Sequence, residues 1–116
     1  MLAVIFELEP VASSKQQYLD IAADLYPELL ATDGFISIER FESLSQPGKL
    51  LSLSFWRDEA AISAWRNLAD HRNAQQAGRD HLFNDYRLRV AEVLRDYGMN
   101  DRAMAPGDSL AVHGHA

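Results

Sequence analysis

The hydrophobic pattern of this chain changes its period in a fixed order, and that order restricts the folds open to it. Apolar residues with the spacing of a strand occur in four segments, and apolar stripes with the spacing of a helix occur in two. The succession strand, helix, strand, strand, helix, strand predicts a ferredoxin-like α+β fold, in which two helices cover one face of an antiparallel four-stranded sheet. The predicted strands are residues 2–8, 35–44, 49–56 and 83–97.

Short signals mark the beginning and end of the first helix. Ser13 or Ser14 is followed three residues later by a glutamine, which predicts a capping box. Pro27 lies inside the apolar stripe and predicts a kink or a restart, because proline removes a backbone hydrogen bond. Gly34 suits the left-handed position that follows a helix.

Other signals concern the strands and the second helix. Asp58 is expected to be the N-cap residue of that helix. Phe35 lies on the opposite parity from the isoleucines that follow it, which predicts a bulge or two-sided burial. The Pro-Gly turn at 47–48 predicts that the second and third strands form a hairpin. A change of parity near residues 91–93 predicts another bulge. The polar residues 71–78 either continue the second helix or restart it after a short break.

Length and charge restrict the class of protein. A chain of 116 residues, 47% of them hydrophobic, fits one domain with its own core. The net charge of −6 argues against nucleic acid or an anionic membrane as the main partner. Residues 57–95 are the exception, with seven basic and six acidic side chains, so any attraction for an anionic ligand is expected there.

The absence of cysteine excludes disulfides, thiolate nucleophiles and cysteine-ligated zinc. The apolar N-terminal segment lacks the basic start of a signal peptide, meets Glu7 and Glu9 at once, and is too short to span a bilayer. We therefore expect a soluble, cytoplasmic protein.

The predicted fold leaves one face of the sheet without helices, yet the first, third and fourth strands carry apolar residues on both parities. Something must cover the second apolar face, and another copy of the chain is the simplest candidate. The sequence therefore predicts a homodimer with sheets packed face to face.

The C-terminal residues have no hydrophobic period and little bulk, which predicts a tail or an arm. The domain is thus placed at residues 1–98 and the tail at residues 99–116. His113 and His115 lie close together in this tail, but two histidines without a third ligand do not predict a metal site.

Three segments together carry a family likeness. "DGF" after the first helix, "SFWRDEAAISAWRN" across the third strand and second helix, and the following "HRNAQQAGR" resemble the antibiotic biosynthesis monooxygenase domain. The resemblance covers about residues 1–97 and points to a branch of small, stand-alone bacterial proteins. It implies the dimeric α/β barrel fold, and a function among quinone-forming oxygenases, haem-degrading enzymes and proteins of unassigned role.

Within that resemblance, Trp65 and His71 are the candidate catalytic residues. Trp65 has the position of a pocket wall, where its indole would stack on a flat substrate; the alternative is an ordinary core tryptophan. On a continuous helix Trp65, Leu68 and His71 share one face. A neutral imidazole at His71 would serve as a general base or orient an oxyanion, and the alternative is a histidine bonded to the backbone at a helix break.

Three further residues are weighed around this pair. Tyr18, on the apolar stripe of the first helix, turns its hydroxyl either into the pocket or into the core. Arg72 either holds an anionic group or forms a solvated ion pair. Asn67 lies two residues after Trp65, so on a regular helix it points about 200° away, which predicts a surface or capping role.

Haem binding fits the sequence poorly. The resemblance to haem-degrading members would require an axial histidine about three turns after the tryptophan, where this chain has Gln75, and an asparagine in the first strand, where it has Phe6 and Glu7. Only a shifted alignment would make His71 or His81 the ligand.

The prediction is therefore a small monooxygenase that acts on a flat aromatic or quinone-like molecule without metal, haem or flavin. Trp65 would form the wall and His71 the base, with Tyr18, Leu68 and Arg72 binding the ligand. The alternatives are a non-catalytic small-molecule-binding dimer and a haem-degrading enzyme.

Overall fold

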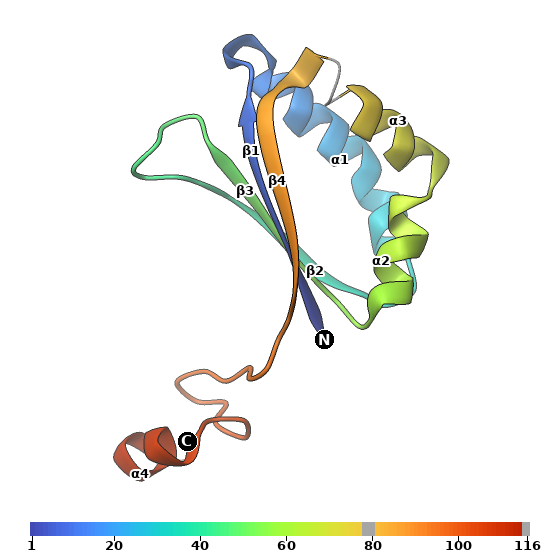
Figure 1. The fold of residues 1–116 in the computed structure, drawn as a ribbon. Helices are drawn as coiled ribbons and strands as arrows, with labels where there is room; N and C mark the ends of the chain where they lie inside the picture. Colours follow the sequence, from blue (N-terminus) through green and yellow to red (C-terminus); the bar gives the residue numbers. More distant parts are fainter. Residues whose placement is uncertain (78–80, 115–116) are drawn as a thin grey trace.

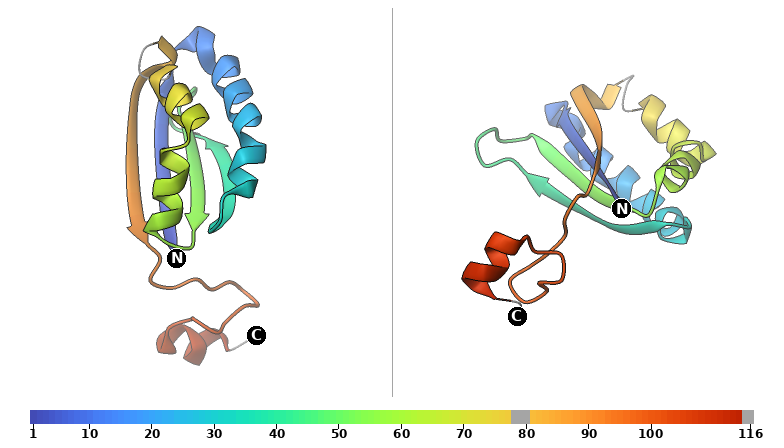
Figure 2. Two further views of the ribbon diagram at one scale, coloured as in Figure 1. Left: turned by 90° about the vertical axis from the view of Figure 1, so that its right-hand side faces the viewer. Right: turned by 60° about the horizontal axis from the view of Figure 1, so that its bottom comes forward.

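The computed structural model describes residues 1–77 and 81–114, and it has the predicted architecture (Figure 1). One antiparallel sheet has the strand order β2-β3-β1-β4. Figures 1 and 2 show α1, α2 and α3 as one layer on a single face of this sheet. The ferredoxin-like α+β fold is therefore confirmed. Its elements are β1 (Leu2–Pro10), α1 (Lys15–Ala31), β2 (Phe35–Glu42), β3 (Leu50–Trp56), α2 (Glu59–Arg66), α3 (Ala69–Ala77) and β4 (Phe83–Glu92).

The first helix begins differently from the prediction. A 3₁₀ turn, η1 (Ala12–Ser14), precedes α1, and Ser14 is the N-cap residue, but its side chain makes no capping hydrogen bond. Its backbone, with φ −113° and ψ 1°, is not in the extended conformation that aims a cap oxygen at the first turn. The capping box is thus wrong. Pro27 lies inside α1, which continues to Ala31 without restarting.

Two predicted features, one after α1 and one at the start of α2, are confirmed. Gly34 has φ +87°, the left-handed conformation expected after the helix. A Cβ atom there would lie 2.6 Å from the Cβ of Ala61, so glycine also permits the close approach of α2. Asp58 caps α2, because its Oδ1 accepts a hydrogen bond of 2.9 Å from the backbone N–H of Ala61.

The strands confirm one predicted bulge and remove the other. The register between β2 and β3 shifts between Phe35 and Ser37, and these two strands form the predicted hairpin. The pairing of β4 with β1 shifts register between Glu9 and Pro10, opposite Asp85 and Phe83, and is regular from there to Glu92, where the strand ends. The parity change near 91–93 is therefore no bulge: Val93 donates its N–H to the carbonyl of Met1, and the chain then leaves the sheet.

Side chains of β3 alternate strictly between the two faces of the sheet. Leu50, Ser52, Ser54 and Trp56 are buried toward the helices, whereas the residues between them point to the open face. The core on the helix side is divided into two small clusters. One contains Leu29, Trp56, Ala61 and Ile62, and the other contains Leu8, Tyr18 and Leu50.

The C-terminal segment is more ordered than its sequence suggested. It projects beyond the end of the sheet and includes a short helix, α4 (Gly107–His113) (Figures 1 and 2). Arg102, only 7% exposed, donates hydrogen bonds to the carbonyls of Gly98 and Gly114 and to the hydroxyl of Ser109. The hydrogen bonds of Arg102 therefore hold this segment together without a periodic row of apolar side chains.

Two general findings concern partners. No helix within residues 1–77 and 81–114 is long and apolar enough to cross a membrane. In the same residues no group of three His, Asp or Glu side chains could hold a metal ion; His113 lies in α4, and His115 is outside the described residues.

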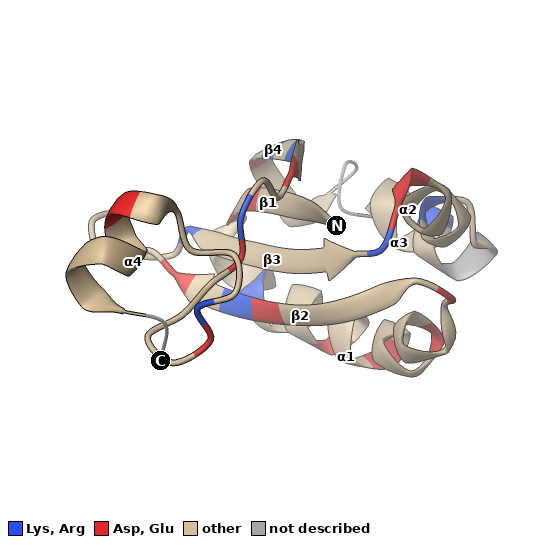
Figure 3. Cartoon of the chain, turned by 90° about the horizontal axis from the view of Figure 1, so that it is seen from below, with Lys and Arg blue, Asp and Glu red and all other residues tan. Residues whose placement is uncertain are grey.

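Acidic and basic residues follow one another along β2, and acidic residues lie along α1 (Figure 3).

Candidate functional site

A cavity of about 430 Å³ lies between the helices and the covered face of the sheet, and it separates the two core clusters. Its walls are mostly apolar. They include Val4 and Phe6 of β1, Leu25 of α1, Trp65 of α2 and Phe83 of β4. A cavity of this size and lining is typical of a small-molecule site.

The cavity opens toward β4, because the helices do not cover that strand. Leu88 and Val90 lie on the wall of the cavity, yet they are 53% and 42% exposed. An apolar ligand would cover the exposed part of this wall.

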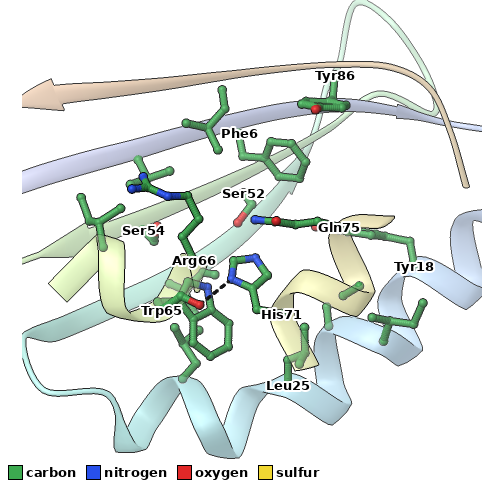
Figure 4. A pocket seen from close by; sticks show the side chains of 18 of the residues that line it. Phe6, Tyr18, Leu25, Ser52, Ser54, Trp65, Arg66, His71, Gln75 and Tyr86 are labelled. Carbon is green, nitrogen blue, oxygen red and sulfur yellow. Dashed lines mark hydrogen bonds between the residues drawn. The ribbon is translucent and has the colours of Figure 1, made fainter. Parts of the chain in front are cut away.

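Trp65 and His71 meet at the break between α2 and α3 (Figure 4). Their ring centroids are 4.6 Å apart with an angle of 34° between the planes, and both rings line the cavity. Their contact was predicted from a continuous helix, but the helix is interrupted. His71 is bonded to the backbone at a helix break, as in the alternative that the sequence left open, since its Nδ1 lies 3.0 Å from the Trp65 carbonyl oxygen.

This hydrogen bond determines the state of the imidazole. A carbonyl oxygen only accepts, so Nδ1 of His71 carries the hydrogen and donates it to Trp65. In the neutral ring Nε2 then has a free lone pair, and Figure 4 shows that nitrogen on the cavity side of the ring. Burial lowers the pKa of His71 below its ordinary value of 6.5, and the charge of Arg72 lowers it further, while the Trp65 carbonyl partly opposes them. His71 is thus a neutral base near pH 7.

Only some of the other predicted site residues lie on the cavity wall. Tyr18 and Arg72 line the cavity, but Leu68 does not: it lies in the α2–α3 connection, 39% exposed. Leu68 is therefore not brought to the cavity wall with Trp65 and His71, because it lies at the break between the two helices. Asn67 has the predicted capping role, as the C-cap of α2 whose Nδ2 donates to the carbonyl of Ser63. Arg72 is held by Asn67 and Gln75 through hydrogen bonds of 2.6 and 3.2 Å.

Arg40 is a cavity residue that sequence reasoning missed. It comes from β2, and its Nε donates a hydrogen bond of 3.4 Å to the hydroxyl of Tyr18. The signal was available, because Arg40 continues the parity of the apolar Ile38 and so belongs to the covered face. Arg40 therefore adds a cation to the cavity wall from outside residues 57–95.

Two buried serines of β3 are also part of the wall. Ser54 accepts a hydrogen bond of 2.9 Å from the indole Nε1 of Trp56. Ser52, 7% exposed, pairs in register with Arg40 and with Phe6. No sequence signal separated these inward serines from the polar side of an ordinary half-exposed strand.

Comparisons with known proteins agree with this fold. The family model described as antibiotic biosynthesis monooxygenase matches residues 1–77. The chain is 50% identical over 101 residues to the jasmonate monooxygenase ABM of Pyricularia oryzae, which covers 87% of this chain and 47% of the fungal protein. It is 34% identical over 68 residues to the uncharacterized protein YqjZ of Bacillus subtilis, covering 57% of this chain and 58% of that protein. The chain thus spans about half the length of the curated relatives it matches.

Solved structures share the architecture at low sequence identity. Rv0793 from Mycobacterium tuberculosis has a TM-score of 0.74 and 20% identity, covering 84% of this chain and 98% of that one. A Deinococcus radiodurans protein that carries the same family name has a TM-score of 0.75 and 19% identity, covering 84% and 97%. At this identity the likeness establishes the fold alone.

Proposed function

Because the chain belongs to the antibiotic biosynthesis monooxygenase family, we propose that it oxygenates a flat aromatic or quinone-like small molecule in the cavity beside Trp65. The observation that carries this proposal is the pairing of the Trp65 ring with a His71 whose Nε2 has no hydrogen-bond partner among the described residues, inside a largely apolar cavity. The fungal relative's name, a monooxygenase acting on jasmonate, supports the reaction class.

The proposed chemistry needs a base and a dry wall. His71 Nε2 removes a proton from an acidic O–H or C–H of the substrate, and the resulting anion transfers electrons to O₂. For a ring CH₂ group the balance is CH₂ + O₂ → C=O + H₂O, so the substrate itself supplies all the electrons. Trp65 holds the ring plane beside His71, and the apolar walls keep water from the reactive anion.

We propose that this reaction uses no metal, haem or flavin. The donor set supports this, since His71 is the one side chain among the described wall residues with a ligand nitrogen suited to metal, and the wall has no described carboxylate. The same free Nε2 keeps haem as the alternative. Haemin titration tests it: we expect no saturable Soret shift, and a saturable shift that His71→Ala abolishes would establish haem binding instead.

Oxygen uptake with anthrones and dihydroxynaphthalenes tests the oxygenase directly. We expect His71→Ala to lower kcat by about 100- to 10,000-fold, the usual contribution of a general base. His113→Ala, on the exposed side of α4, is the matched control and should leave kcat unchanged. Saturable binding of these compounds without oxygen uptake by the unaltered protein would identify a non-catalytic binder.

We also propose that the protein is a homodimer joined through the open face of its sheet. The apolar side chains Ile5, Leu51, Leu53 and Phe55 lie at the centre of that face, since they alternate with the residues that line the cavity. Glu7 and Arg89, joined by an ion pair of 3.2 Å, lie beside them. An apolar centre with charged residues around it is typical of a protein interface.

A further inference from the structure

We propose that Arg40, with Tyr18 and Ser52, binds the carboxylate of an otherwise apolar substrate in this cavity. The inference rests on the proposed function only in taking this cavity as the substrate site. It adds the chemical class of the substrate, an apolar ring compound that carries one acid group, and it names the residues that recognise that group.

The guanidinium of Arg40 is half-buried and incompletely paired. Its Nε donates to Tyr18, whose ring lies under the cation with its centroid 6.0 Å from Cζ. Its two terminal nitrogens have no hydrogen-bond partner, and no carboxylate pairs with it, among the residues that the structure describes. A carboxylate would accept two parallel hydrogen bonds from this free edge.

Ser52 adds a hydroxyl beside the same position. It is the direct cross-strand partner of Arg40 on the covered face, and its side chain is buried on the cavity wall. Its hydroxyl has no hydrogen-bond partner within the described part of the chain, in contrast to Ser54, which is bonded to Trp56. Tyr18 accepts from Arg40, so its own hydrogen stays available. The three side chains therefore offer the hydrogen bonds that a desolvated carboxylate requires.

The charge of the wall favours an anion. Arg40, Arg66 and Arg72 line the cavity, and no Asp or Glu is among its described lining residues, although the whole chain has a net charge of −6. Arg72 is engaged with neutral amides, and Arg66 is exposed to solvent, which weakens its pull on a ligand. Arg40 is the most enclosed of the three.

The position of the acid group is consistent with the proposed chemistry. In Figure 4, Tyr18 lies at one end of the cavity and Trp65 at the other, with His71 between them. A carboxylate fixed at Arg40 and Tyr18 would extend its apolar body past Phe6 toward His71 and Trp65. One charged anchor and a long apolar wall fit a monocarboxylic acid better than a phosphate, which needs more donors for its larger charge.

The test compares 1-naphthaleneacetic acid with its methyl ester by titration calorimetry at neutral pH. These probes share the apolar body and differ in the anionic group. We expect the acid to bind at least about tenfold more tightly than the ester, and Arg40→Gln to remove that preference while the ester's affinity stays unchanged. Arg40→Lys keeps the charge without the paired donors and should restore only part of the preference. Ser52→Ala should weaken the acid alone, by a few-fold.

Arg95→Gln, outside the cavity, is the matched control and should bind both probes as the unaltered protein does. A melting curve confirms that each variant is folded. Equal affinity for acid and ester, a preference that persists in Arg40→Gln, or a preference lost in Arg66→Gln instead would each overturn the proposal. Because the measurement is binding, a missing oxygenase activity would contradict the proposed function and leave this result standing.

Discussion

The two faces of the sheet are built from alternate residues of the same strands, but in the middle of β3 they differ in chemistry. On β3 the covered face carries Ser52 and Ser54, whereas the open face carries Leu51, Leu53 and Phe55. In the middle of β3 the more apolar side chains therefore point away from the helices, although Leu50 and Trp56 at the ends of the strand point toward them. The comparison indicates that the covered face is shaped for a cavity with polar contacts, and that the open face is shaped for another apolar surface.

The covered face loses packing in exchange for this cavity. Its core is two small clusters instead of one, and the exposed inner side of β4 is apolar. Burying Ser52 and Ser54 in place of larger apolar residues forgoes hydrophobic stabilisation of about 25 cal/mol per Å². A site that departs from the usual apolar pattern is where function is expected to be found.

Among the changes that compare the two faces, the largest expected effect is on the open face. Leu53→Glu would place a carboxylate at the centre of the proposed interface, next to Ile5 and Glu39 in register. Burial of an unpaired charge there should weaken self-association on the order of 100-fold or more, a loss of at least ~2.7 kcal/mol. Sedimentation would then give the monomer mass of 13.0 kDa where the unaltered protein gives twice that value.

A polar change on the other face of the same strand is the control. Ser52→Ala should leave the sedimenting mass unchanged, because Ser52 points into the cavity. A monomeric unaltered protein, or a Leu53→Glu variant that associates normally, would contradict the assignment of the open face to a dimer.

A smaller effect separates the two serines of the covered face. Ser54→Ala leaves the buried indole N–H of Trp56 without its acceptor, and should lower the free energy of unfolding by about 1–3 kcal/mol. Ser52→Ala removes an identical group that holds no such partner, and should change stability by less than about 0.5 kcal/mol. Urea unfolding measures both. Equal losses would show that Ser52 has a structural role and would weaken its assignment to the ligand.

The fold followed from the sequence because its signals are local and consistent. The order of strand and helix periods, the Asp58 cap and the left-handed Gly34 each correspond to an observed element. The failures are also local. Ser14 was assigned a cap from its residue type alone, although its backbone conformation does not allow one. The order around Arg102 could not be predicted, because one buried guanidinium leaves no periodic pattern.

The site was predictable only in part. Helical spacing predicted that Trp65 and His71 lie on one face, and their rings are in contact despite the break between α2 and α3. The same assumption of a continuous helix misplaced Leu68. Arg40 and Ser52 come from strands far from that helix, and periodicity within one element cannot show which strand residues share a wall with it.

The smallest expected effect concerns the titration of His71. Because burial lowers its pKa below the ordinary value of 6.5, the acid limb of kcat/KM should lie at lower pH than an unperturbed histidine would give, as the imidazole is protonated. Arg72→Gln removes a positive charge that lowers this pKa, so the acid limb should move to higher pH, whereas Arg72→Lys should leave it in place.

The lowered pKa of His71 also makes stability depend on pH. The folded protein binds the proton less readily than the unfolded chain, so the free energy of unfolding falls as pH drops from about 6.5 through the folded pKa. In Arg72→Gln that fall should be smaller. An acid limb that moves down in Arg72→Gln would show that His71 is not the titrating base.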